Sequence, residues 1–156
     1  MKNNTWYELL KEWKSFLSEN IKLSDDAEIK SYVERLKNLT LDFKNQCEGD
    51  DYEHYITRTD LLYQQLENIL YHDSISKIGE GVSRVGYSFK DKPWVLKLAK
   101  SVKGAEDNKR ELDIHQRKHG QGASDIFVNL YYWDDVNEDP WWVISEKVKP
   151  LSEIED

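Results

Sequence analysis

The first half of the chain places its hydrophobic residues at the spacing of amphipathic helices. Over residues 28–47 the mostly apolar positions step by four and three, so they share one helical face. These positions are Ile29, Val33, Leu36, Thr40, Phe43 and Cys47. The same periodicity over 5–21 and 52–70, with a break at EGDD (48–51), predicts two more helices. We therefore expect a three-helix module over residues 1–72, with the apolar stripes as its core.

From residue 74 onward the pattern changes to the alternation of β-strands. It predicts strands near residues 74–79, 84–90, 93–99, 127–134 and 141–148. One helical stretch, residues 105–118, interrupts the strands, and Leu112 and Ile114 are its expected apolar face. The chain is thus predicted to be α+β, with a second domain over residues 73–156. That domain should be a five-stranded antiparallel sheet with one packed helix.

Composition and charge limit the classes of function. Hydrophobic residues make up 38% of the chain and charged residues 33%, and the net charge is −8. This acidity argues against binding to nucleic acid or to anionic membranes. The single cysteine, Cys47, excludes an internal disulfide, and no apolar run reaches the ~18 residues of a membrane span. We expect a cytoplasmic protein without an export signal.

The stretch around Gly79 and Lys97 contains the strongest candidate chemistry. Gly79 and Gly81 lie at the expected turn between the first two strands, where backbone amides without a nearby Cβ can approach phosphate oxygens. Lys97 interrupts the apolar run WVLKLA, and its ammonium would reach such phosphates from the inner face of the third strand. Glu111, on the next helix, would hold that ammonium. The alternative is an ordinary hairpin turn, with Lys97 on the solvent side of an edge strand.

In this order the motifs resemble the small N-terminal lobe of the protein-kinase-like fold, over residues 74–152. GEGVSRVGY, beginning at Gly79, resembles the glycine-rich loop. Lys97 resembles the lysine of the third strand, and Glu111 resembles the helix glutamate that pairs with it. The segment WWVISEKVKP resembles the fifth strand and the hinge, where backbone groups of Glu146 and Val148 would face an adenine. The resemblance implies a vestigial nucleotide site at Gly79, Gly81, Arg84, Lys97, Glu111, Glu146 and Val148.

Departures from the family pattern argue against catalysis. Arg84 stands where the family has its third glycine, and Gly86 stands where a valine roofs the adenine. Lys97 and Glu111 are closer in sequence than is usual in the family. Neither an H-R-D catalytic loop nor a D-F-G metal site occurs before Asp156. We expect no phosphate transfer, no required cofactor and at most weak binding of ATP with magnesium.

Three functions are compatible with these observations. The first is a non-catalytic interaction or inhibitory protein on a kinase small-lobe scaffold. Its partner-binding surface would include exposed aromatic residues of the helical half, with Trp6, Tyr7, Trp13 and Tyr55 as candidates. The second is a fragment or short member of an ATP-dependent kinase whose catalytic lobe is absent from this chain. The third is an acidic mimic of nucleic acid, formed by the clusters at 48–53 and 134–139.

Our expectations about the class of partner and about a metal site rest on weaker signals in the sequence. A composition rich in Lys, Asn, Asp and Tyr is similar to that of small accessory proteins of bacteriophages and mobile elements, so we expect a host or defence protein as partner. His115 and His119 lie in line with Glu111 at a spacing that zinc sites use. Because no HExxH motif or cysteine cluster accompanies them, we expect no metal site.

Overall fold

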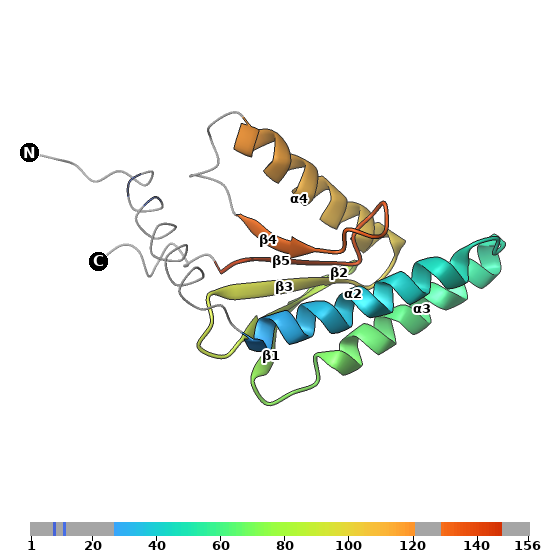
Figure 1. Cartoon of the computed structure of the whole chain (residues 1–156), viewed down its shortest axis with the longest axis horizontal. Helices are drawn as coiled ribbons and strands as arrows, with labels where there is room; N and C mark the ends of the chain where they lie inside the picture. The colour runs from blue at the N-terminus through green and yellow to red at the C-terminus, as the bar shows by residue number, and fades with distance from the viewer. Residues whose placement is uncertain (1–7, 9–10, 12–26, 121–128, 148–156) are drawn as a thin grey trace, which may run out of the picture.

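The computed structural model describes residues 8, 11, 27–120 and 129–147. These residues form an α+β structure with three helices and a five-stranded antiparallel sheet (Figure 1). The elements in chain order are α2 (Ala27–Cys47), α3 (Tyr52–Ile69), β1 (Ile75–Glu80), β2 (Arg84–Phe89), β3 (Trp94–Ala99), α4 (Val102–Gly120), β4 (Leu130–Trp133) and β5 (Trp142–Glu146). The first expected helix lies outside the described residues except for Glu8 and Lys11, which are helical.

The α2–α3 hairpin confirms the helical periodicity of the sequence. Five of the six stripe positions on α2 are buried, and Cys47 is half-buried. Thr40 is tolerated in this core because its hydroxyl donates a hydrogen bond of 2.9 Å to the Leu36 carbonyl. After the EGDD break, α3 begins at a cap in which an Asp51 carboxylate oxygen accepts from the His54 N–H at 2.9 Å. The hairpin is therefore held by an apolar seam and by a defined start of its second helix.

The sheet has the strand order β1-β2-β3-β5-β4, and every neighbouring pair is antiparallel. The expected turn between the second and third strands is present, with Asp91 at φ 58°. Alternate residues of β3 face opposite sides of the sheet: Trp94, Leu96 and Leu98 are buried in the core shared with the hairpin. Val143 of β5 instead packs in a second cluster with α4. The sheet thus lies between the hairpin and α4 (Figure 1).

Helix α4 corrects one sequence prediction. It begins at Val102, three residues earlier than expected. Leu112 is buried against Leu130 and Val143, as predicted, but Ile114 is 41% exposed. Each residue of an α-helix turns by about 100° relative to the one before it. Ile114, two positions after Leu112, is therefore rotated by about 200° and lies on the opposite side of the helix. Among the described residues, no helix combines the length and apolar character needed to cross a membrane.

Candidate functional site

The glycine turn between β1 and β2 is a closed hairpin. Gly79 lies opposite Gly86 in the strand register, and the Gly81 N–H donates to the Arg84 carbonyl at 2.8 Å. The Lys100 ammonium donates to the Gly81 carbonyl at 3.3 Å from the next turn. Beneath the hairpin is a hollow of about 390 Å³, whose lining includes these three glycines and Lys97. The turn therefore borders a space, although one of its amides is already hydrogen-bonded.

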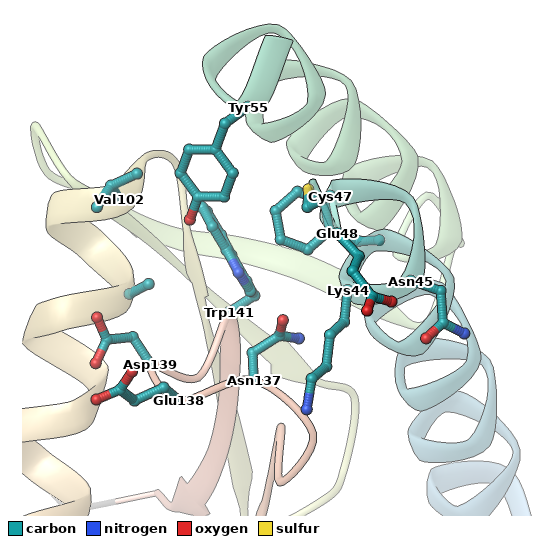
Figure 2. A pocket seen from close by; sticks show the side chains of 12 residues that line it. Lys44, Asn45, Cys47, Glu48, Tyr55, Val102, Asn137, Glu138, Asp139 and Trp141 are labelled. Atoms are coloured by element: carbon teal, nitrogen blue, oxygen red, sulfur yellow. The ribbon is translucent and has the colours of Figure 1, made fainter. Parts of the chain in front are cut away.

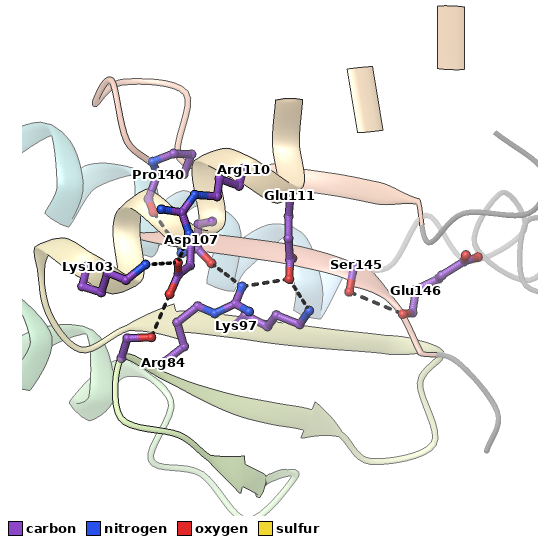
Figure 3. A network of polar contacts seen from close by, with 11 residues as sticks. Arg84, Lys97, Lys103, Asp107, Arg110, Glu111, Pro140, Ser145 and Glu146 are labelled. Atoms are coloured by element: carbon purple, nitrogen blue, oxygen red, sulfur yellow. Dashed lines mark hydrogen bonds and ion pairs between the residues drawn. The ribbon is translucent and has the colours of Figure 1, made fainter. Parts of the chain in front are cut away.

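Lys97 and Glu111 lie in direct contact beside this hollow. The Lys97 ammonium is 2.8 Å from Oε1 of Glu111, across the gap between β3 and α4 (Figure 3). Lys97 is paired with Gly86 on one side and with Val143 on the other, so β3 is a central strand. The alternative of a lysine on the solvent side of an edge strand is wrong. The pair forms because α4 crosses the face of β3 from which Lys97 projects.

A second cation, Arg84, shares the same carboxylate. Its guanidinium nitrogen Nη1 lies 2.9 Å from Oε1 of Glu111 and donates to Asn108 Oδ1 at 3.2 Å. Asn108 is fully buried, and its amide donates to the Pro140 carbonyl at 2.9 Å. Asn108 was not predicted as a site residue. The only signal in the sequence was its position one helical turn before Glu111.

The charge balance around Glu111 favours its ionised form. Burial by itself would raise the pKa of this carboxyl group. The hydrogen bonds and positive charges of Lys97 and Arg84 outweigh burial, and the pKa is lowered below its usual value. Glu111 thus stays an anion that orients two cations toward the hollow.

Asp107 joins the glycine hairpin to the same helix. The Ser83 hydroxyl donates to Oδ2 of Asp107 at 2.9 Å. Lys103 and Arg110 lie 2.8 Å and 2.9 Å from Oδ1, and the hydrogen bond from Lys103 is the main cause of the lowered pKa of Asp107. These contacts fix the hairpin relative to α4, and so they also fix the geometry of the Lys97–Glu111 pair.

The expected hinge residue Glu146 lies at the end of β5, opposite Trp94 in the register. Its N–H donates to the Asn129 carbonyl at 3.0 Å, and its Oε1 accepts from the Asn129 N–H at 3.1 Å. Val148 lies outside the described residues. The structure therefore brings together the glycines, Arg84, Lys97 and Glu111. Glu146 lies apart from them, because its strand partner Trp94 is three positions before Lys97 on β3. Its amide N–H is already hydrogen-bonded to the Asn129 carbonyl.

Of the candidate partner-binding aromatics, only Tyr55 is among the described residues. Trp6, Tyr7 and Trp13 lie outside them. Tyr55 is half-buried, and its ring is 6.0 Å from that of Phe43. It lines a pocket of about 540 Å³ between the α2–α3 hairpin and the segment before β5 (Figure 2).

Several acids of the supposed nucleic-acid mimic have structural roles. Asp51 caps α3, and Asp50 forms an ion pair with Arg58. Asp134 is 1% exposed and accepts backbone N–H groups from Val136 and Trp141. These carboxylates stabilise turns and a helix end.

The comparisons with known proteins leave the function to be argued from this geometry. The chain matches no protein-family model, and neither curated proteins nor solved structures give a match. Across residues 27–120 and 129–147, no three His, Cys, Asp or Glu side chains are grouped to hold a metal ion. The side chain of His119 is not among those described.

Proposed function

We propose that the chain is an interaction protein on a scaffold that resembles the small lobe of protein kinases, and that by itself it transfers no phosphate. The observation that carries this proposal is the 2.8 Å contact between Lys97 and Glu111 beside the glycine hollow. In protein kinases a third-strand lysine paired with a helix glutamate positions the nucleotide phosphates. The partner we propose is another protein, with a host or defence component as the candidate class.

The proposal that this chain transfers no phosphate rests on the groups that phosphate transfer requires. A kinase also needs a base for the acceptor hydroxyl and ligands for its magnesium ions. The printed sequence contains no H-R-D or D-F-G motif. The carboxylate nearest to Lys97, that of Glu111, already accepts from two cations. The scaffold therefore holds a lysine in place without the groups that would act on a bound phosphate.

Nucleotide affinity should be low because this half-site is open on one side. One hinge hydrogen bond contributes about 1 kcal/mol, and one-sided apolar contact contributes about 1–2 kcal/mol. A partly solvated ammonium adds about 1 kcal/mol. The total of about 3–4 kcal/mol corresponds to a dissociation constant of about 1 mM or weaker.

The same lysine–glutamate pair favours a second candidate function. This is the nucleotide-binding half of an ATP-dependent kinase whose catalytic lobe is supplied separately. The two candidates differ in the affinity that they require of the hollow. A functional ATP site needs a micromolar constant that depends on Lys97, whereas an interaction scaffold does not.

The deciding experiment combines a calorimetric titration with ATP and magnesium and a transfer assay with radiolabelled ATP. The matched variants are Lys97→Ala and Lys90→Ala, since Lys90 is an exposed lysine of the β2–β3 turn. We expect no transfer and a near-millimolar constant for the wild type. Micromolar binding or labelling that Lys97→Ala abolishes and Lys90→Ala retains would replace the proposal with the kinase alternative.

A further inference from the structure

The pocket between the hairpin and the segment before β5 has an aromatic floor. Phe43 meets Trp141 edge-to-face, with ring centroids 5.4 Å apart, and the ring centroid of Tyr55 is 6.0 Å from that of Phe43. Val102 and Ala105 of α4 add aliphatic surface. The volume of about 540 Å³ lies within the ~300–1,000 Å³ that is typical of ligand sites. The pocket therefore offers apolar contact area to a side chain or small molecule.

The rim of this pocket is acidic. Glu138 and Asp139 lie on the side of α4, and Glu48 lies across the opening on the hairpin (Figure 2). Within the described part of the chain, no hydrogen bond or ion pair engages these three carboxylates. Lys44 is the one described cation of the lining, and its ammonium already donates to the Val136 carbonyl at 3.0 Å. The rim thus has negative charge that its own lysine only partly offsets.

Tyr55 provides a second indication that this charge acts on the pocket interior. Burial raises the pKa of its phenol, and Cys47 and Asp139 raise it further when they are ionised. Asp139 and Tyr55 line the same pocket, so the negative charge of Asp139 would favour a cation lying on the aromatic rings.

We propose that this pocket receives an arginine side chain of a partner protein, a step that rests on the proposed function as an interaction protein. A guanidinium stacks on aromatic rings and is less strongly hydrated than an ammonium. Its aliphatic stem packs on apolar surface while its N–H groups donate to carboxylates at the rim. Arginine and aromatic residues are also the commonest anchors of protein interfaces. An anionic partner, by contrast, would be repelled by Glu138 and Asp139.

The first test is an NMR titration of the full chain with the capped tripeptide Ala-Arg-Ala. The matched control peptide has citrulline in place of arginine, which keeps the shape of the side chain and removes its charge. We expect the arginine peptide to shift the indole N–H signal of Trp141 and to bind about tenfold more tightly than the citrulline peptide. Equal binding of the two peptides, or no binding by the arginine peptide, would overturn the proposal.

The second test uses charge-neutralising variants that keep side-chain shape. Glu138→Gln with Asp139→Asn should weaken the arginine peptide about tenfold. Asp135→Asn is the control, because Asp135 is an exposed acid of the same segment that does not line the pocket. It should change the constant less than about twofold. If the control weakened binding as much as the double variant, general charge attraction would account for the effect and the site would be rejected.

The two proposals are separable by affinity capture. A partner protein held equally by the wild type and by the double variant would leave the proposed function standing and overturn only this site. Failure of both forms to hold any protein partner, together with a micromolar ATP constant, would overturn the proposed function. The peptide titrations contain no nucleotide, so their outcome does not depend on the Lys97 site.

Discussion

Gly104, in the first turn of α4, lies directly against the carbonyl oxygen of Ser83 in the glycine hairpin. A Cβ atom on Gly104 would overlap that oxygen and would lie 3.0 Å from Cα of Ala99. The same oxygen accepts the Lys100 N–H at 2.8 Å, so it is not free to move away. This close approach sets the distance between α4 and the sheet, and it thereby brings Glu111 within reach of Lys97.

Substituting Gly104 by alanine should destabilise the fold. Helix propensity alone favours alanine by about 1 kcal/mol, but overpacking against fixed backbone costs about 1–3 kcal/mol. The steric term should win, with a net loss of up to about 2 kcal/mol in the free energy of unfolding measured in urea. Glu106→Ala, at an exposed position of the same helix, should stay within about 0.5 kcal/mol. A more stable Gly104→Ala variant would mean that the contact is not a constraint.

Asp134 should be essential for the segment that leads into β5. Its two carboxylate oxygens accept the backbone N–H groups of Val136, Asn137 and Trp141 at 3.1–3.3 Å. Asp134→Ala would leave the buried Trp141 amide and the half-buried amides of Val136 and Asn137 without this acceptor, so we expect a loss of about 2–4 kcal/mol. Asp135→Ala removes the neighbouring, exposed acid and should cost less than about 1 kcal/mol. Similar midpoints for the two variants in thermal unfolding would refute this assignment.

Glu111 should make part of the free energy of unfolding vary with pH in the acid range. Its pKa in the folded chain is lowered, so its contribution is present above the unfolded pKa of about 4.3. That contribution disappears as the pH falls through the folded pKa. Glu111→Gln should therefore cost about 1–2 kcal/mol near pH 7, and this cost should shrink as the pH falls through the lowered folded pKa. Urea titrations of both proteins at several pH values give this difference directly, and a gap that stays constant with pH would contradict it.

The elements of the fold were largely predictable because their causes are local. The α2 stripe alternates by four and three, and burial of one face follows from that spacing alone. The two strands that flank the turn at Asp91 were visible in the alternation of their residues. Ile114 was misassigned because a short apolar pair was assumed to share one face, which the helical period forbids.

The site was only half predictable because its geometry depends on contacts distant in sequence. Lys97 and Glu111 were expected to meet, and they do. The shared role of Arg84 depends on how closely α4 approaches the sheet, and no local pattern specifies that distance. Asn108 was missed for the same reason, since its importance comes from the Pro140 carbonyl, 32 residues further along the chain. The pocket at Tyr55 likewise forms only when the hairpin and the segment before β5 are brought together.

Lys97 and Arg84 should be partly redundant, because both contact the same oxygen of Glu111. The side chains of Lys97 and Arg84 are each about one-third exposed or less. If either cation is removed, the Glu111 carboxylate still has the other as its partner. Lys97→Met and Arg84→Met should therefore each cost about 0.5–1 kcal/mol. Removing both leaves a mostly buried anion without a cationic partner, which is far more costly than an exposed one.

The double variant should accordingly lose more stability than the sum of the two single variants. We expect a coupling of about 0.5–1.5 kcal/mol in a double-mutant cycle measured by urea unfolding near pH 7. Repeating the cycle in the Glu111→Gln background is the control. Without the carboxylate only the direct repulsion between the two cations couples them, so the coupling should fall to that smaller residual value. Strict additivity in the wild-type background would mean that the two cations act independently, and that Glu111 is not their common anchor.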